Sequence, residues 1–138
     1  DILSQVGNSF DPHYFLQFDE NAKGAKLSRG NDLRSFPYQV LDLIRIFEPG
    51  NELNIRVLNW FGHGLFIFIL VGKNRSKPFN QKIAGENYHF CLATKPWSYP
   101  EIILDRQWTN EPNESQLGTN TFSQYFKGMN CSNQPNKV

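Results

Sequence analysis

The most suggestive group of ligand-binding side chains lies between residues 105 and 111. This segment reads Asp-Arg-Gln-Trp-Thr-Asn-Glu and places charged and amide groups on both sides of an indole. Such groups hydrogen-bond hydroxyls, and an indole face can stack on the apolar side of a sugar ring. We predict a carbohydrate site in which Trp108 stacks and three neighbours make hydrogen bonds: Asp105, Arg106 and Glu111. The alternative is that Trp108 only covers one end of the core.

The three histidines, His13, His63 and His89, lie far apart in the sequence. None forms a helical i, i+4 pair or joins a cysteine at the spacing of a metal site, so we predict no metal site and no cofactor. His63 lies between glycines and is expected in a solvated turn. His89 lies in an expected strand, where its imidazole could face a ligand. We therefore add His89 to the predicted ligand-binding residues, with a structural role as the alternative.

No catalytic motif is apparent in the sequence. It contains no GxSxG, phosphate-binding-loop or GxGxxG pattern, and no nucleophile stands beside a candidate base in a recognised motif. Two acidic pairs exist, Asp19 with Glu20 and Glu101 with Asp105. Glycosidic chemistry needs two carboxyl groups that face each other at a defined separation, which a sequence does not specify. We therefore predict a protein that is not an enzyme.

Length and charge limit the remaining classes. The chain has 138 residues, enough for one domain with a real core, and we expect a single β domain over residues 1–131 and a flexible tail at 132–138. Its 14 basic and 13 acidic residues leave a net charge of +1. That balance lacks the basic surface that nucleic-acid binding requires, so we expect no nucleic-acid partner.

Several features favour a secreted glycoprotein. The two cysteines, Cys91 and Cys131, permit one intrachain disulfide. Three glycosylation patterns begin at Asn74, Asn113 and Asn130, in segments that we expect to be exposed. The chain begins with aspartate, which is consistent with a removed signal peptide or with trimming. We predict an extracellular protein with glycans on Asn74 and Asn113.

Two strands are expected in the middle of the chain. Residues 53–57 alternate in polarity, which places their apolar members on a buried face and Asn54 and Arg56 in water. Residues 65–71 are all apolar and predict a central strand with no exposed face. Seven residues fall far short of the roughly twenty that span a membrane, so no membrane span is predicted.

The remaining pattern consists of short elements punctuated by Pro, Gly and Asn. Strands are expected at residues 14–18, 35–47, 88–93 and 101–105, although the spacing within 35–47 also suits a helix. Residues 72–78 are expected to form a basic turn, and residues 96–100 a loop. These elements predict an all-β, antiparallel β-sandwich of jelly-roll type, with a closed β-barrel as the alternative.

Parts of the chain resemble a galectin-type lectin domain. Residues 49–55 and 66–70 are similar to its opening strands, with Pro-Gly, an alternating strand and then Phe-x-Ile-x-Leu. The pair His89-Phe90 resembles the start of its His-x-Asn-Pro-Arg strand, and residues 108–111 match its Trp-x-x-Glu. The resemblance spans residues 49–111. It implies an indole that stacks on galactose and a carboxylate that accepts hydrogen bonds from sugar hydroxyls.

The leading prediction is a secreted carbohydrate-binding module whose partner is a glycan or a glycoprotein. Residues 91–93 read Cys-Leu-Ala where the galectin family has Asn-Pro-Arg, so specificity for galactose is not carried over. One alternative is a barrel that encloses an apolar small molecule. The other is a secreted effector or inhibitor that binds a protein through exposed aromatic residues on turns: Trp60, Phe61, Trp97 and Tyr99.

Overall fold

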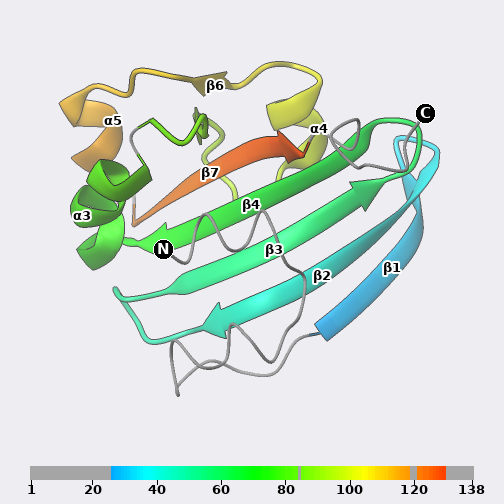
Figure 1. The fold of residues 1–138 in the computed structure, drawn as a ribbon, viewed down its shortest axis with the longest axis horizontal. Coiled ribbons are helices and arrows are strands. Elements are labelled where there is room, and N and C mark those ends of the chain that lie inside the picture. The colour runs from blue at the N-terminus through cyan, green and yellow to red at the C-terminus, as the bar shows by residue number, and fades with distance from the viewer. Residues whose placement is uncertain (1–25, 84, 119–120, 130–138) are drawn as a thin grey trace.

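A computed structural model describes residues 26–83, 85–118 and 121–129 of the chain. Its strands form one antiparallel sheet in the order β1-β2-β3-β4-β7-β5-β6 (Figure 1). The strands are β1 (Lys26–Leu33), β2 (Phe36–Ile46), β3 (Leu53–Trp60), β4 (Gly64–Gly72), β5 (His89–Cys91), β6 (Trp108–Thr109) and β7 (Phe122–Met129). The described helices are α3 (Lys73–Ile83), α4 (Tyr99–Ile103) and α5 (Glu114–Gly118). The predicted all-β, antiparallel class is confirmed, but the described strands do not close into the alternative barrel.

The apolar run at residues 65–71 forms most of β4, which is the middle strand of the sheet. β4 pairs with β3 on one side and with β7 on the other. Its residues from Ile67 to Val71 are all buried, and successive side chains point to opposite faces of a strand. Both faces of the sheet are therefore covered at β4, as the unbroken apolar pattern predicted.

A separate apolar core covers each face of the sheet. One core contains the large buried residues Leu43, Ile44, Ile55, Ile67, Ile69 and Tyr125. The other contains Leu58, Trp60, Phe68, Tyr99, Ile102 and Phe126. Helix α3 packs beside α5 at the end of β4, and α4 lies towards the other end of this strand (Figure 1).

Arg56 is not in water as the alternation of β3 suggested. Its Nε donates a hydrogen bond to Asp42 Oδ1 at 2.7 Å, and its Nη1 donates one to the Tyr99 hydroxyl at 2.8 Å. Its guanidinium carbon lies 3.9 Å from the ring centroid of Trp97. Asn54, on the same strand, is also buried. The prediction failed for Arg56 because Trp97 and Tyr99, at the start of α4, cover its side chain.

Residues 36–46 form a strand as predicted, whereas two other segments are helical. The expected turn at 72–78 is instead the start of α3, whose inner face comprises Ser76, Phe79 and Ile83 at helical spacing. The expected strand at 101–105 is instead largely α4, which begins with a proline in its first turn. None of the described helices is long and apolar enough to cross a membrane.

Several predictions concern residues outside the described part of the chain: His13, the strand at 14–18, Asn130, Cys131 and the tail at 132–138. Cys91, the predicted disulfide partner of Cys131, is buried and carries a free thiol. Burial raises the pKa of this thiol.

The aromatic residues predicted to form an exposed protein-binding surface are mostly internal. Trp60 is fully buried and donates its indole N–H to the Leu33 carbonyl at 3.0 Å. Tyr99 is also buried, and Trp97 is half-buried. Phe61 is exposed. The four residues therefore do not form the expected surface patch.

Candidate ligand-binding site

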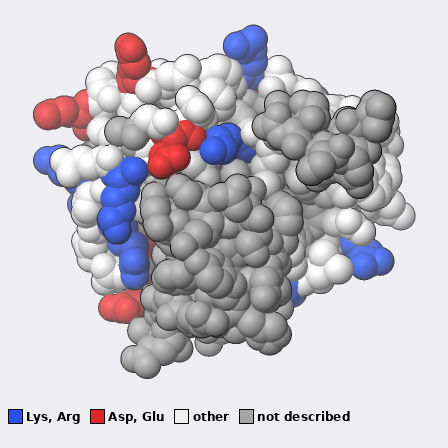
Figure 2. Space-filling model, viewed as in Figure 1, with Lys and Arg blue, Asp and Glu red and all other residues white. Residues whose placement is uncertain are grey.

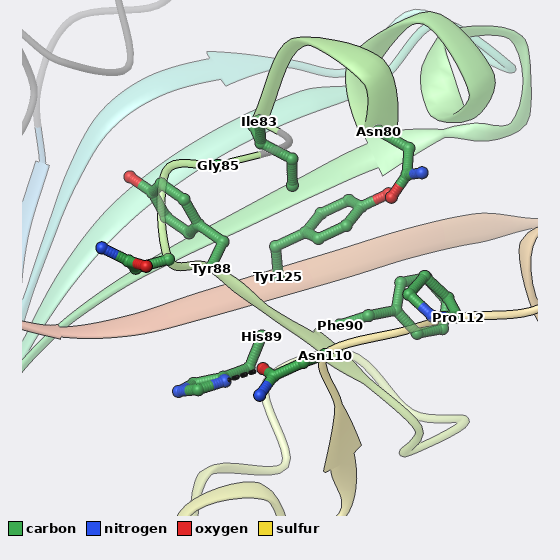
Figure 3. A pocket seen from close by; sticks show the side chains of 10 residues that line it. Asn80, Ile83, Gly85, Tyr88, His89, Phe90, Asn110, Pro112 and Tyr125 are labelled. Atoms are coloured by element: carbon green, nitrogen blue, oxygen red, sulfur yellow. Dashed lines mark hydrogen bonds between the residues drawn. The ribbon is translucent and has the colours of Figure 1, made fainter.

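A pocket of about 390 Å³ opens where α3, β5 and the segment after β6 meet (Figure 3). Its volume lies within the range of roughly 300–1,000 Å³ that is usual for small-molecule sites. The polar residues of the lining are Asn80, Asn87, Tyr88, His89, Asn110 and Tyr125; the Tyr88 hydroxyl is itself buried, and Tyr125 is only 1% exposed. The apolar part of the lining consists of Ile83, Phe90, Pro112 and the two tyrosine rings.

The lining comes from four segments of the chain: α3, the turn at 85–88 with β5, residues 110–112, and β7. Asn80 and Ile83 lie in the second half of α3, and a tight turn then leads into β5. This turn contains Gly85 and Asn87, which have positive φ angles of 87° and 65°. Glycine and asparagine adopt that conformation more readily than other residues. The turn therefore reverses the chain directly beside the pocket.

β5 and β7 form the floor of the pocket. Phe90 pairs with Tyr125 across these two strands, and their rings lie edge to face with centroids 5.4 Å apart. Both side chains are buried in the first core. The floor is therefore rigid and aromatic, and it is continuous with the packing of the sheet.

Two hydrogen-bonded pairs lie near the pocket on opposite faces of the sheet, because Tyr125 belongs to the first core whereas the His89 ring contacts Trp108 and Phe126 of the second (Figure 3). On one side the Tyr125 hydroxyl donates to Asn80 Oδ1 at 3.2 Å. On the other, His89 Nδ1 and Asn110 Oδ1 are 2.5 Å apart. Because Oδ1 can only accept, Nδ1 carries the proton in this bond. The polar groups are thus fixed in orientation before any ligand arrives.

The lining of the pocket carries no carboxylate and no permanently charged base among the described residues, since none of them is acidic and none is lysine or arginine. Burial, together with the charge of Glu86, raises the pKa of Tyr88 to about 12. Burial also raises the pKa of Tyr125. Both phenols therefore remain protonated and act as hydrogen-bonding hydroxyls.

Tyr88 forms one wall and has an unusual environment. Its hydroxyl oxygen is buried and has no hydrogen-bond partner among the described residues. The Lys127 ammonium lies 4.8 Å from the ring centroid and donates a hydrogen bond to the Glu86 carbonyl. A cation at that distance is attracted by an aromatic face and helps to hold the ring in place.

The structure brings three of the five predicted ligand-binding residues together. His89 lines the pocket, and the Trp108 ring lies 4.0 Å from the imidazole, centroid to centroid. The Arg106 guanidinium carbon lies 5.2 Å from the Trp108 ring centroid. Asp105 and Glu111 are exposed, and neither belongs to the lining.

Sequence reasoning missed most of the pocket. Asn80 lies in the second half of α3, beyond the turn expected at 72–78 and in a stretch to which no element was assigned, and Tyr125 lies in an aromatic stretch to which no strand was assigned. Asn110 belongs to the predicted cluster but was not singled out. The aromatic residues Phe122, Tyr125 and Phe126, which favour strands, were the available signal for β7.

Asn74 and Asn113, the predicted glycosylation positions, are both exposed. Asn113 precedes α5, and its Oδ1 accepts a hydrogen bond from the Gln116 backbone N–H at 2.9 Å. Gln116 Oε1 accepts a hydrogen bond from the Asn113 backbone N–H in return. This reciprocal arrangement is a capping box, and it fixes Asn113 at the start of the helix.

Acidic and basic side chains are interspersed over the described part of the face shown in Figure 2. This distribution agrees with the net charge of +1.

Comparisons with protein-family models, with curated proteins and with solved structures found no match for this chain. The galectin resemblance over residues 49–111 therefore stays a prediction, and the function must be inferred from the pocket.

Proposed function

We propose that this protein is a carbohydrate-binding module, without enzymatic activity, that holds a neutral sugar in the pocket between α3, β5 and residues 110–112. The observation that carries the proposal is the chemistry of the lining, which combines amides, hydroxyls and an imidazole with aromatic and aliphatic surface. A sugar ring has hydroxyls around its edge and apolar C–H groups on its faces. Both parts of such a ligand find complementary groups here.

A purely apolar ligand fits this pocket less well. It would shield Asn80, His89 and Asn110 from water without offering them hydrogen bonds. Each polar group buried in that way costs about 1–3 kcal/mol. A hydroxylated ligand replaces those lost hydrogen bonds, so the polar lining favours a sugar over a hydrocarbon.

The predicted residues around β6 take a supporting role in this proposal. The Trp108 ring lies against the His89 imidazole with the two planes tilted by 31°, and the imidazole centroid also lies 5.1 Å from that of the Phe126 ring. Arg106 lies over the same indole. We propose that this stack holds His89 at the edge of the pocket, where the imidazole hydrogen-bonds the sugar.

The proposal is tested by presenting the purified protein to a broad glycan array and titrating the best sugars by isothermal calorimetry. We expect saturable binding, and we expect His89→Ala to weaken it at least about tenfold, since a hydrogen bond and a wall of the pocket are lost. His63→Ala is the matched control, because His63 stacks on Trp60 in the turn before β4, whereas α3 follows the other end of this strand. Absence of binding on the array, or equal effects of the two substitutions, would contradict the proposal.

A further inference from the structure

The Asn80 side chain offers the pocket a hydrogen-bond donor of fixed orientation. Its Oδ1 accepts a hydrogen bond from the Tyr125 hydroxyl at 3.2 Å, and Tyr125 is only 1% exposed, so this bond is not open to a ligand. The amide also carries two N–H donors on Nδ2, which have no partner among the described residues. Asn80 is half-buried and lines the pocket, and Figure 3 shows its nitrogen on the side away from Tyr125. The nitrogen is therefore free to bind an acceptor.

Apolar side chains on the same face of the sheet lie beside this donor. Ile83 follows Asn80 by three positions in α3, a spacing that places two side chains about 5–6 Å apart on one side of a helix. Both are directed from α3 towards Tyr125 (Figure 3). Ile83, Phe90 and Tyr125 belong to the first core, and all three line the pocket. This part of the pocket therefore combines an N–H donor with aliphatic and aromatic surface.

The charge of the lining narrows the groups that can bind next to Asn80. None of the described lining residues is a carboxylate, a lysine or an arginine. An ammonium or carboxylate group on a sugar would lose hydration there without gaining an opposite charge, which is unfavourable. A hydroxyl would accept a hydrogen bond from Asn80 and leave the apolar neighbours uncovered. An acetamido group offers an uncharged carbonyl acceptor with a methyl group on the same carbon, so it matches both.

We infer, on the basis of the proposed function, that the pocket selects an N-acetylated sugar. The acetamido carbonyl accepts a hydrogen bond from Asn80 Nδ2, and the methyl group packs on Ile83 and Phe90. Asn80 is the residue that determines specificity. Tyr125 is a positioning residue, because it acts on the ligand only by holding the Asn80 oxygen.

The first test compares sugars on the unmodified protein by isothermal calorimetry at neutral pH. The probes are the methyl glycosides of glucose, galactose and mannose, each with its 2-acetamido, 2-formamido and 2-amino derivative, and methyl glucuronide. For the sugar that binds best, we expect the acetamido form to bind at least about tenfold more tightly than the parent hexoside, because it adds one hydrogen bond and one buried methyl. The formamido form, which lacks the methyl, should lie between the two. A parent hexoside, an amino sugar or a glucuronide that binds as tightly as the acetamido form would overturn the inference.

The second test changes the donor. Asn80→Asp keeps the oxygen that Tyr125 contacts and replaces Nδ2 with an acceptor. We expect this variant to lose the preference for the acetamido form and to bind the 2-amino sugar at least about tenfold more tightly than the wild type, because a carboxylate then faces the ammonium. Asn59→Asp is the matched control, since it makes the same change in a half-buried asparagine that contacts Gln39 and does not line the pocket. The control should keep the wild-type preference, and thermal unfolding of both variants should stay cooperative.

The third test concerns the positioning of the amide. Tyr125→Phe keeps the ring and the Asn80 donor but frees the amide to rotate, so the preference for the acetamido form should fall at least about threefold. Tyr99→Phe is its control, because it removes another buried phenol, one that contacts Arg56 in the second core. A preference that Tyr125→Phe leaves intact would overturn the positioning role.

The possible results separate the inference from the proposed function. Wild-type protein that binds none of the sugars contradicts both. Sugar binding without a preference for the acetamido form, or a preference that Asn80→Asp and Asn59→Asp lower equally, leaves the carbohydrate function standing and overturns the assignment of Asn80.

Discussion

The position of His89 is set by side chains from three directions. Trp108 on β6 and Phe126 on β7 contact its ring, and Asn110 binds its Nδ1. An imidazole held in this way loses little conformational freedom when it binds a ligand, which raises affinity without an additional contact. Trp108 therefore influences the site through His89.

Trp108→Ala should weaken sugar binding while the protein stays folded. The indole is half-buried, so we expect a loss of stability of roughly 1–3 kcal/mol, below the 3–5 kcal/mol typical of fully buried aromatic residues. Calorimetric titration and thermal unfolding measure the two effects separately. Trp97→Ala is the control, because it removes another half-buried indole, which lies against Arg56 and is not among the residues that line the pocket. Loss of cooperative unfolding in Trp108→Ala would show that the indole is needed for the fold itself.

Asn74 and Asn113 should both carry glycans when the chain is expressed behind a signal peptide in eukaryotic cells. Both are exposed, and the Asn113 side chain caps α5 through its oxygen and leaves the nitrogen for the glycan. Mass spectrometry before and after enzymatic deglycosylation measures occupancy, and Asn74→Gln and Asn113→Gln should each remove one glycan. A secreted chain without any glycan would contradict the glycoprotein prediction.

At the scale of elements, α4 is joined to the sheet by a network of polar side chains. Arg56 on β3 contacts Asp42 on β2 and Tyr99 on α4. The Arg56 and Asp42 side chains are 19% and 7% exposed, so their interaction is only partly screened by water. By contrast, Arg34 and Glu101 form an ion pair at 3.5 Å with both side chains largely exposed.

Asp42→Ala should destabilise the protein by about 2–3 kcal/mol, because it leaves the Arg56 charge half-buried without its carboxylate. Glu101→Ala removes an exposed ion pair and should change the free energy of unfolding by less than about 1 kcal/mol. Chemical denaturation of the two variants measures the difference. Equal effects would mean that the Asp42 and Arg56 pair is as well solvated as the surface pair.

The pattern of residues predicted β2, β3, β4 and β5 but missed β1, β6, β7 and the described helices. The alternating pattern at 53–57 predicted β3, and the apolar run at 65–71 predicted β4 because packing on both faces of a strand requires such a run. In α3, charged residues at positions 73, 75, 77 and 82 concealed the inner face that begins with Ser76. In α4, Ile102 and Ile103 favour a strand by propensity, yet a proline start and burial of Ile102 stabilise a helix.

The candidate site was predictable only in part. His89 and the cluster around Trp108 were identified from residue type, since an aromatic ring beside hydrogen-bonding groups suits a sugar. Asn80 and Tyr125 could not be identified, because their proximity depends on where α3 and β7 lie in the folded sheet. A sequence specifies which groups are present, and the topology decides which of them meet.

At the scale of the whole molecule, buried phenols link stability to alkaline pH. Burial is the largest cause of the raised pKa values of Tyr88, Tyr99 and Tyr125. A group whose pKa is higher in the folded state contributes its full stability below its unfolded pKa and loses it as pH rises towards the folded value. For Tyr88 this interval extends from about 10 to about 12.

The free energy of unfolding should therefore fall as pH rises above about 10. Urea denaturation at successive pH values measures the fall, and absorbance near 295 nm follows ionisation of the phenols. Tyr88→Phe should make the fall less steep, because that phenol can no longer ionise. A free energy of unfolding that stays constant up to pH 12 would mean that the phenols have equal pKa values in the folded and unfolded chain.

The pocket takes its walls from segments as distant as residues 80 and 125, and it exists only where α3, β5 and β7 are packed together. A ligand that binds there has no corresponding site in the unfolded chain. Occupancy must therefore favour the folded state, by about 2.7 kcal/mol when the ligand is present at a hundred times its dissociation constant. Resistance to heat or to proteolysis would then report the concentration of the ligand, and mixtures of natural compounds can be searched for it by the rise in melting temperature alone.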